Sequence, residues 1–107
     1  MRIIARRTLR EFVASRARAP DHGALKAALD AWFHEVRKAR WKSAAVLKRQ
    51  YATASVVSAE RVVFNIRGNR YRLVAAVDFE KSIVWIKWIG THREYDDIDV
   101  TEVEHDG

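Results

Sequence analysis

Residues 61–74 read Arg-Val-Val-Phe-Asn-Ile-Arg-Gly-Asn-Arg-Tyr-Arg-Leu-Val, and this stretch decides the fold. Apolar and polar side chains alternate on either side of Gly68-Asn69, a pattern typical of two strands joined by a tight turn. A two-residue turn at that point pairs Asn65 with Arg72, and directly paired residues share one face of a sheet. The stretch therefore predicts an antiparallel hairpin with one apolar face and one polar face.

The polar face of this hairpin is predicted to be cationic, because it holds Arg67, Arg70 and Arg72 beside Asn65. Like charges placed directly opposite each other in a sheet repel. Three arginines on one face therefore indicate an anionic partner that neutralises them, with phosphate the leading choice. The alternative is an ordinary solvated face of a half-buried sheet.

A second hairpin is predicted around Glu80-Lys81, between strands near 70–79 and 83–89. If this turn also has two residues, Leu73 pairs with Trp88, and Trp88 joins the apolar core face. The same register gives the cationic face three further residues, Trp85, Lys87 and Ile89. An indole among cations is typical of surfaces that bind single-stranded nucleic acid. The alternative places the indole of Trp85 in a second core layer beneath the C-terminal segment.

The first half of the chain predicts helices, because its apolar residues recur every three or four positions. The expected elements are an edge strand at 3–5, helices over 8–18 and 23–39, a short helix after residue 43, and a strand near 54–58. Thr8 and Glu11 have the spacing of a capping box, and Asp21 and Ser43 are the expected caps of the later helices. These elements predict an α+β fold, with two to three N-terminal helices on one face of a twisted antiparallel sheet.

The composition limits the class of protein. With 107 residues, the chain is expected to form a single domain. It has no cysteine, which excludes a disulfide scaffold, a thiolate metal site and a cysteine nucleophile. The four histidines are too scattered for a metal site, and no cofactor is predicted. No apolar run reaches the roughly 18 residues that span a bilayer, and arginines interrupt the N-terminus, so we expect a cytoplasmic protein without a membrane partner.

Charge is distributed unevenly along the chain. Seven of the 14 acidic residues lie between Glu94 and Gly107, a segment without lysine or arginine, so residues 1–93 carry all 20 basic residues. A body this basic attracts polyanions, and nucleic acid is the first candidate, ahead of an acidic protein or a membrane surface. The acidic extension, residues 100–107, has three interpretations: a solvated tail, a cover that competes with ligand for the cationic face, or an edge strand of the fold.

The segment that follows the last predicted strand combines side chains with catalytic chemistry. Gly90 lets the chain turn off the sheet, and His92, Arg93 and Tyr95 then fall within four positions. Imidazole, guanidinium and phenol groups can transfer protons or stabilise charge during phosphodiester cleavage. We therefore expect reactive groups at this end of the cationic sheet.

Two segments of the chain resemble the HigB toxin family of type II toxin–antitoxin systems. They are residues 65–72, Asn-Ile-Arg-Gly-Asn-Arg-Tyr-Arg, and residues 90–96, Gly-Thr-His-Arg-Glu-Tyr-Asp, with shorter matches at 41–43 and 47–48. That family is similar to RelE-type mRNA interferases, small domains with N-terminal helices packed on a twisted antiparallel sheet. Its members cleave mRNA, generally on the translating ribosome, and are neutralised by a helix-turn-helix antitoxin. The acidic residues from 100 onward depart from the family pattern.

The resemblance also implies roles for individual residues. The RNA 2′-hydroxyl is the nucleophile in such enzymes, so no metal ion is needed. His92 is then the acid or base, and Tyr95 is a second candidate for the general acid. Arg72 and Lys87 would stabilise the charge on the phosphate. The implied RNA-binding residues are Asn65, Arg67, Asn69, Arg70, Trp85 and Arg93.

Two alternatives to a ribonuclease remain open at this point. The chain could be a basic nucleic-acid-binding module without catalysis. It could also be a toxin of the RelE/ParE fold whose target is not RNA. The combination of His92 and Tyr95 with the cationic face favours the enzyme over both.

Overall fold

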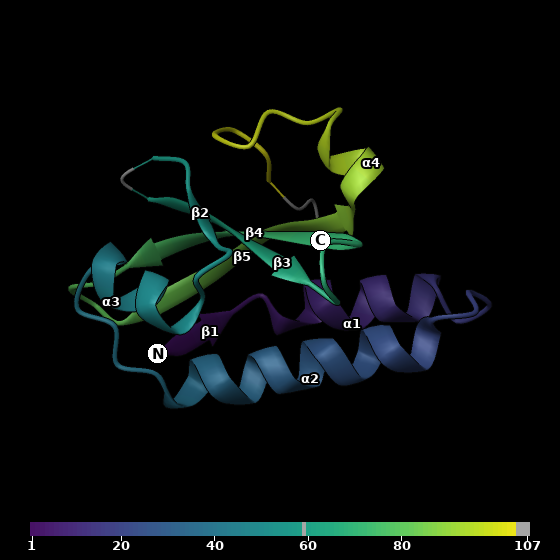
Figure 1. The fold of residues 1–107 in the computed structure, drawn as a ribbon, viewed down its shortest axis with the longest axis horizontal. Coiled ribbons are helices and arrows are strands. Elements are labelled where there is room, and N and C mark those ends of the chain that lie inside the picture. The colour runs from purple at the N-terminus through teal and green to yellow at the C-terminus, as the bar shows by residue number, and fades with distance from the viewer. Residues whose placement is uncertain (59, 105–107) are drawn as a thin grey trace.

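The computed structural model describes residues 1–58 and 60–104, and it places α1 and α2 on one face of a five-stranded sheet (Figure 1). The helices are α1 (Arg6–Ser15), α2 (His22–Lys38), α3 (Ala44–Gln50) and α4 (His92–Tyr95). The strands are β1 (Arg2–Ile4), β2 (Ser55–Val56), β3 (Arg61–Ile66), β4 (Tyr71–Asp78) and β5 (Ile83–Thr91). The α+β class expected from the sequence is confirmed.

The strands lie in the order β1-β5-β4-β3-β2. Strands β2 to β5 are antiparallel to their neighbours, as expected, whereas β1 pairs parallel to β5 through Arg2 with Ile83 and Ile4 with Trp85. The sheet is therefore mixed at one edge. The chain reaches β1 first and returns to the same edge only after three helices and three strands, which permits the parallel pairing.

The hydrophobic core lies between the helices and one face of the sheet. The buried residues of α2 are Leu25, Leu29, Trp32 and Val36, which follow the helical period that the sequence shows. The indole of Trp32 meets the ring of Phe64 edge-on at 5.3 Å between ring centroids. Burying a side chain of this size contributes about 1.5–3 kcal/mol, so this row is the main support that α2 gives the sheet.

The register of the first hairpin is confirmed. Asn65 pairs with Arg72, and Phe64 pairs with Leu73, so the apolar and polar faces separate as predicted. Gly68 has a φ of 68° in the turn, where a residue without a side chain is favoured. The hairpin therefore fixes which side chains of β3 and β4 face away from the helices.

The register of the second hairpin is correct near its turn and wrong beyond Ile86. A β-bulge between Val74 and Ala75 shifts the pairing, so Val74 pairs with Trp88 and Leu73 pairs with Ile89. Ile89 is consequently a core residue, and Trp88 leaves the core face, which reverses the prediction for both. Bulges re-aim side chains in this way because one strand carries an extra residue, here Lys87.

The predicted capping box of the first helix is also wrong. The helix begins at Arg6, directly after Ala5, whose φ of 71° turns the chain out of β1. The hydroxyl side chain of Thr8 is buried inside the helix, and Glu11 accepts a hydrogen bond from Arg7. Helix α1 ends at Ser15, earlier than predicted. The cap at Ser43 is confirmed, since its hydroxyl accepts from the Val46 backbone amide at 3.3 Å.

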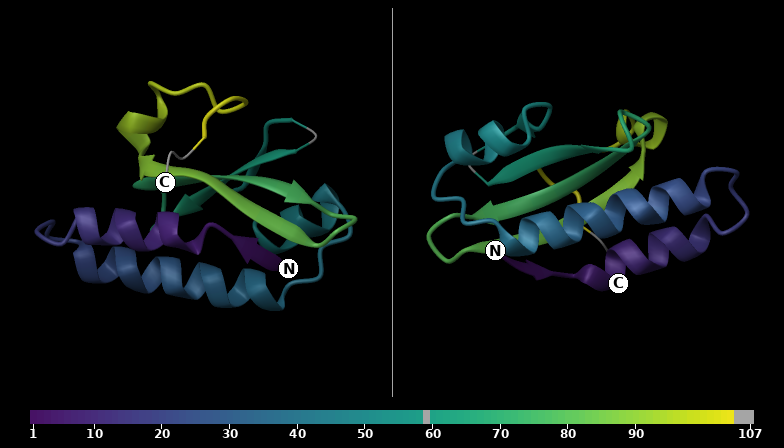
Figure 2. Two further views of the ribbon diagram at one scale, coloured as in Figure 1. Left: turned by 180° about the vertical axis from the view of Figure 1, so that it is seen from behind. Right: turned by 60° about the horizontal axis from the view of Figure 1, so that its bottom comes forward.

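The C-terminal segment covers the sheet face opposite α1 and α2 (Figures 1 and 2). Val63 and Val74 on this face are buried, although neither belongs to the helix-side core. The described residues 100–104 of the acidic extension form no strand, and Glu104 contacts Arg61 and Lys87 on the outer face, which favours a cover at this part of the sheet. Residues 105–107 of that extension lie outside the described residues.

Candidate functional site

Arg72 lies on the outer face of β4, in the middle of the strand order and at the end of the sheet nearest α4. Its guanidinium donates a hydrogen bond to the backbone carbonyl of Asn69 at 2.6 Å and lies 5.8 Å from the ring centroid of Tyr95. Asn65 is its cross-strand partner on β3. Three of the residues predicted from the sequence, Arg72, Tyr95 and Asn65, thus lie together. Arg72 is half-buried, and the Asn69 carbonyl and the Tyr95 ring contact its guanidinium on two sides.

The short helix α4 positions Tyr95. Its N-terminus carries a full capping box, in which the Thr91 hydroxyl accepts from the Glu94 amide at 3.2 Å and the Glu94 carboxylate accepts from the Thr91 amide at 2.8 Å. The ring of Tyr95 also contacts Trp88, at 6.4 Å between centroids. The bulge in β5 is what turns Trp88 toward this face, so the bulge supports the site directly.

Gly90 is required beneath this arrangement because the Trp88 indole lies over its α-carbon. A β-carbon at position 90 would collide with the six-membered ring of Trp88. We expect Gly90→Ala to destabilise the fold by about 1–3 kcal/mol, the typical cost of overpacking, and to displace Trp88 and Tyr95. Thermal unfolding measures the first effect. Gly23→Ala is the matched control, since nothing lies within 4 Å of that position, and an equal loss in both variants would contradict this account.

His92 lines a groove of about 490 Å³ at the end of the sheet, and the described lining of this groove does not include Arg72. The cationic residues of its lining are Arg16, Arg70 and Arg93. The backbone amide of His92 donates to the Arg70 carbonyl at 3.0 Å, which ties α4 to the β3–β4 turn. His92 and Arg93 are exposed, so both are accessible to a ligand in the groove. The groove and the Arg72 face are therefore two parts of one cationic end of the molecule.

Arg67 does not lie on the cationic face, contrary to the sequence prediction. Its φ of 54° ends the strand alternation, and its guanidinium pairs with the Asp21 carboxylate at 3.3 Å, on the helix side. The Tyr71 hydroxyl donates to the same carboxylate at 2.6 Å. That bond, with Arg67 and Arg16 nearby, holds the pKa of Asp21 below its ordinary 3.8, whereas burial raises the pKa of Tyr71. Asp21 thus cross-links the hairpin to α2 rather than capping the helix with its side chain.

This cross-link gives the fold a defined dependence on pH. A carboxyl whose folded pKa is lowered stabilises the fold above its unfolded pKa, and the contribution is lost as the pH falls through the folded value. We expect Asp21→Asn to lower the melting temperature at neutral pH and the deficit to shrink below pH 3.8. Melting curves across that range, with the exposed Asp96→Asn as control, provide the measurement. A deficit that stays constant with pH would show that the charge is irrelevant.

Lys87 and Trp85 form a second cluster on the outer face. The ammonium of Lys87 pairs with Glu104 at 3.1 Å and lies 5.1 Å from the Trp85 ring. Lys87 sits beside Val74, two residues along β4 from Arg72, a separation of about 7 Å along the strand. The indole of Trp85 is 45% exposed, which excludes the second-layer core role that the sequence left open.

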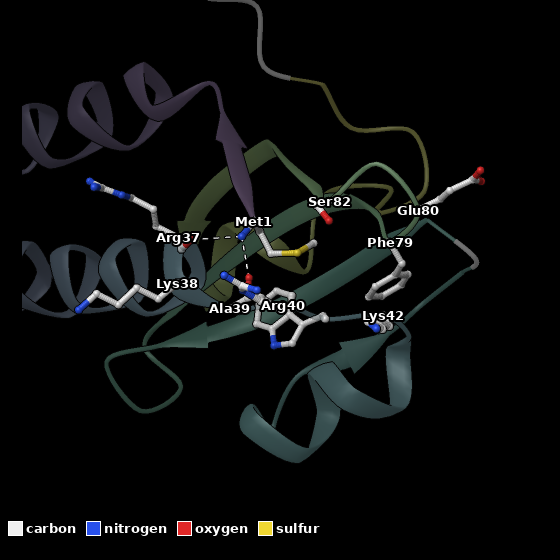
Figure 3. Close-up of a pocket in the computed structure, with 10 residues that line it drawn as sticks. Met1, Arg37, Lys38, Ala39, Arg40, Lys42, Phe79, Glu80 and Ser82 are labelled. Atoms are coloured by element: carbon white, nitrogen blue, oxygen red, sulfur yellow. Dashed lines mark hydrogen bonds between the residues drawn. The ribbon is translucent and has the colours of Figure 1, made fainter.

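A further hollow lies at the opposite end of β5 from α4 (Figure 3). It has a volume of about 1120 Å³, and the N-terminal amine within it donates to the carbonyls of Arg37 and Ala39 at 3.2 and 2.7 Å. Its described lining includes several cations but no histidine or tyrosine. We therefore place the candidate site at the α4 end, where such groups gather.

The comparison with protein-family models settles the family. Residues 25–98, from α2 to just beyond α4, match the HigB toxin model, described as a RelE-like toxic component of a toxin–antitoxin system. The chain belongs to the HigB toxin family. A comparison with curated proteins gave no match. As a RelE-like toxin of a toxin–antitoxin system, this HigB family member has an antitoxin as its partner. No helix among the described residues is long and apolar enough to cross a membrane.

Two cationic residues of this HigB family chain escaped the sequence reasoning. Arg16 follows α1 and reaches the His92 groove, where its Nε atom is buried without a hydrogen-bond partner in the described residues. Arg61 begins β3 and is 9% exposed on the outer face. Both lie outside the recognisable motifs, and only their positions in the fold bring them to the site. The one available signal was strand alternation, which places Arg61 on the same outward face of the sheet as Asn65.

Proposed function

We propose that this toxin is an endoribonuclease that cuts mRNA on the translating ribosome, in the cytoplasm, and so stops translation and growth. The main support is the contact of Arg72 with Tyr95 on a cationic surface, where the Arg72 guanidinium lies 5.8 Å from the centroid of the Tyr95 ring. His92 lies one helical turn before Tyr95 in α4. Membership of a RelE-like toxin family supports the same reaction.

The proposed chemistry uses the RNA 2′-hydroxyl as the nucleophile. That hydroxyl loses a proton, its oxygen attacks the adjacent phosphorus, and the bond to the 5′-oxygen breaks as this oxygen gains a proton. The Arg72 guanidinium, which has donors in a fixed fork, stabilises the charge on the phosphate. His92 and Tyr95 are the proposed proton-transfer groups, and neutral imidazole is suited to this task near physiological pH.

The remaining polar groups of this end are proposed to bind RNA around the scissile phosphate. Asn65, Asn69, Arg70 and Arg93 surround Arg72 or His92 and contact phosphates or base edges. Arg16 would extend the phosphate contacts along the His92 groove. Arg67 keeps Asp21 as its partner and supports the turn that presents these residues.

Controlled expression of the toxin in bacteria tests the proposal. We expect incorporation of labelled amino acids to stop within minutes, with fragments of mRNA appearing before any loss of DNA integrity. Co-expression of an antitoxin encoded beside the toxin gene should prevent both effects. Early DNA damage with intact mRNA would instead indicate a toxin of this fold with a target other than RNA.

A further inference from the structure

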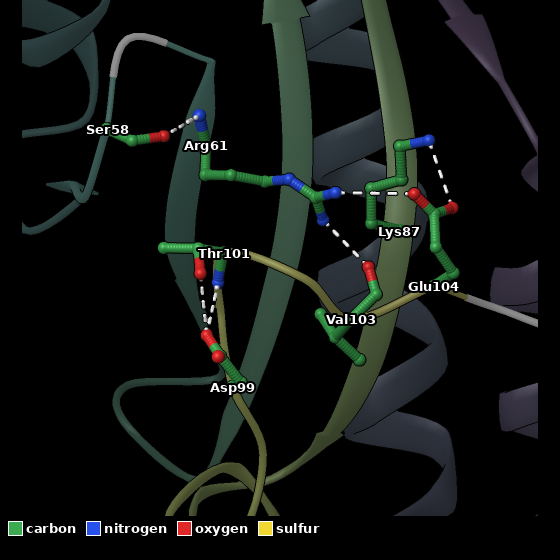
Figure 4. Close-up of polar contacts among 7 residues, drawn as sticks. All are labelled: Ser58, Arg61, Lys87, Asp99, Thr101, Val103 and Glu104. Carbon is green, nitrogen blue, oxygen red and sulfur yellow. Dashed lines mark hydrogen bonds and ion pairs between the residues drawn. The ribbon is translucent and has the colours of Figure 1, made fainter.

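Arg61 is a buried cation on the outer face of the sheet. Only 9% of the residue is exposed, and its guanidinium donates to the Val103 carbonyl at 2.8 Å and to the Glu104 carboxylate at 3.3 Å (Figure 4). A guanidinium stays protonated at all relevant pH values. Because an unpaired buried charge is strongly destabilising, Arg61 needs an anionic or acceptor partner in every state of the protein.

Glu104 joins Arg61 to a second cation. One oxygen of its carboxylate pairs with Arg61, and the other pairs with Lys87 at 3.1 Å, so a single anion bridges β3 and β5 (Figure 4). The hydrogen bond from Lys87 is the largest of the effects that lower the pKa of Glu104 below its ordinary 4.5. The side chain of Glu104 is 57% exposed, so this anion can be exchanged for another from solution.

The surroundings of this pair of cations suit a nucleotide better than a simple anion. Ala76 is the cross-strand neighbour of both Arg61 and Trp85, and its small side chain leaves the exposed indole accessible beside the cations. A groove of about 580 Å³ runs along Trp85 and is also lined by Phe79, Glu60 and Asp78, while Arg61 and Lys87 lie outside its described lining. Aromatic faces beside cations bind bases by stacking while the cations hold the phosphate.

We propose that Arg61 and Lys87 form a phosphate-binding site for RNA, with Trp85 stacking on the adjoining base, and that Glu104 occupies this site in the free toxin in place of the phosphate. This proposal depends on the proposed function in one respect, namely that the polyanion bound at this site is RNA. A backbone phosphodiester offers the same two acceptor positions and the same single negative charge as the carboxylate, and it arrives linked to a base that Glu104 lacks.

The site holds a phosphate that flanks the scissile one. Arg61 lies four residues along β3 from Asn65, a distance of about 13 Å at the usual rise per residue. The cut, by contrast, is assigned to Arg72 and α4 at the other end of these strands. Release of the C-terminal segment from Arg61 and Lys87 is thus coupled to RNA binding along the whole outer face.

The test compares Glu104→Gln with Glu102→Gln. Both variants remove one negative charge from the same segment, but the Glu102 carboxylate has no ion pair within residues 1–58 and 60–104, so only Glu104→Gln frees the proposed site. The probe is a fluorescent single-stranded RNA with 2′-O-methyl groups, which cannot be cut through its 2′-oxygen. We expect Glu104→Gln to bind this RNA about two- to tenfold more tightly than Glu102→Gln at low salt, because the change removes the carboxylate that competes with phosphate for two cations.

Two further variants, Lys87→Gln and Trp85→Ala, test whether these residues form the RNA-binding site. The gain from Glu104→Gln should disappear in combination with Lys87→Gln, and Trp85→Ala should weaken RNA binding by roughly fivefold or more. Arg61→Gln is measured too, with thermal unfolding beside it because Arg61 is buried. If Arg61→Gln does not fold, RNA binding is compared with Lys87→Gln alone. Oligoglutamate serves as a second probe that has charge but no bases, and Trp85→Ala should not affect its binding.

Equal RNA affinities for Glu104→Gln and Glu102→Gln would overturn the proposal. Tighter binding of oligoglutamate alone would also overturn it and would assign the site to an acidic protein partner. A lower melting temperature of Glu104→Gln with weaker RNA binding would make the segment part of the fold and reject the exchange. If wild-type protein fails to cut mRNA while these affinities behave as expected, the nuclease function fails and the phosphate site stands.

Discussion

Replacement of Arg72 by alanine is expected to abolish growth arrest while leaving the protein folded. The guanidinium is the proposed phosphate ligand at the catalytic centre, and loss of one such group typically costs roughly 10²–10³ in rate. The fold should tolerate the change, because the bond that Arg72 makes to the Asn69 carbonyl lies at the exposed turn. Growth after induction and the cleavage rate of purified protein measure the effect.

Two variants control for charge and geometry at this position. Arg49→Ala removes an exposed arginine on α3, far from the candidate site, and should leave the arrest intact. Arg72→Lys keeps the charge but loses the planar fork, so it should recover only part of the rate. A folded Arg72→Ala protein that arrests growth like the wild type would remove Arg72 from the mechanism.

Replacement of His92 by glutamine should abolish cleavage and preserve RNA or ribosome binding. Glutamine retains hydrogen-bonding groups but cannot exchange a proton near neutral pH, and a positioned acid–base group contributes typically about 10²–10⁴ in rate. His92 is exposed at the start of α4, and the capping box there uses Thr91 and Glu94, so the helix should persist. Single-turnover cleavage and co-sedimentation with ribosomes separate the two properties.

His34→Gln provides the matched control, since this histidine is exposed on α2 away from the groove. Its cleavage rate should equal that of the wild type. If His92→Gln cuts mRNA at the wild-type rate, His92 is structural and Tyr95 becomes the leading proton-transfer group. Tyr95→Phe, which keeps the ring contacts with Arg72 and Trp88, then tests that assignment.

Turn chemistry explains which parts of the fold could be predicted. Gly68-Asn69 admits few conformations other than a tight turn, and the register of the first hairpin follows from it. The bulge at Lys87 has no comparable local signal, because the packing of Trp88 against Tyr95 and over Gly90 requires it. A one-residue shift exchanges the two faces, so Trp88 and Ile89 were assigned to the wrong sides.

The same distinction holds at the candidate site. Arg72 and Asn65 were predictable because strand alternation places them together, and the structure does so. Arg67 was misplaced because its positive φ ends that alternation one residue before the turn. The capping-box spacing of Thr8 and Glu11 gave a wrong prediction, whereas the same spacing of Thr91 and Glu94 corresponds to a true helix start. Long-range partners such as Glu104 for Arg61 leave no local pattern in the sequence.

We propose that this protein cleaves RNA through the 2′-hydroxyl at the Arg72 end of the sheet. The most direct measurement incubates purified toxin with translating ribosomes and two mRNAs, one normal and one with a single 2′-deoxy substitution at the mapped cut. We expect a cut in the normal mRNA that leaves a 5′-hydroxyl and a 2′,3′-cyclic or 3′-phosphate end, and no cut at the substituted position. Equal cleavage of both mRNAs, or no cleavage of either, would contradict this proposal.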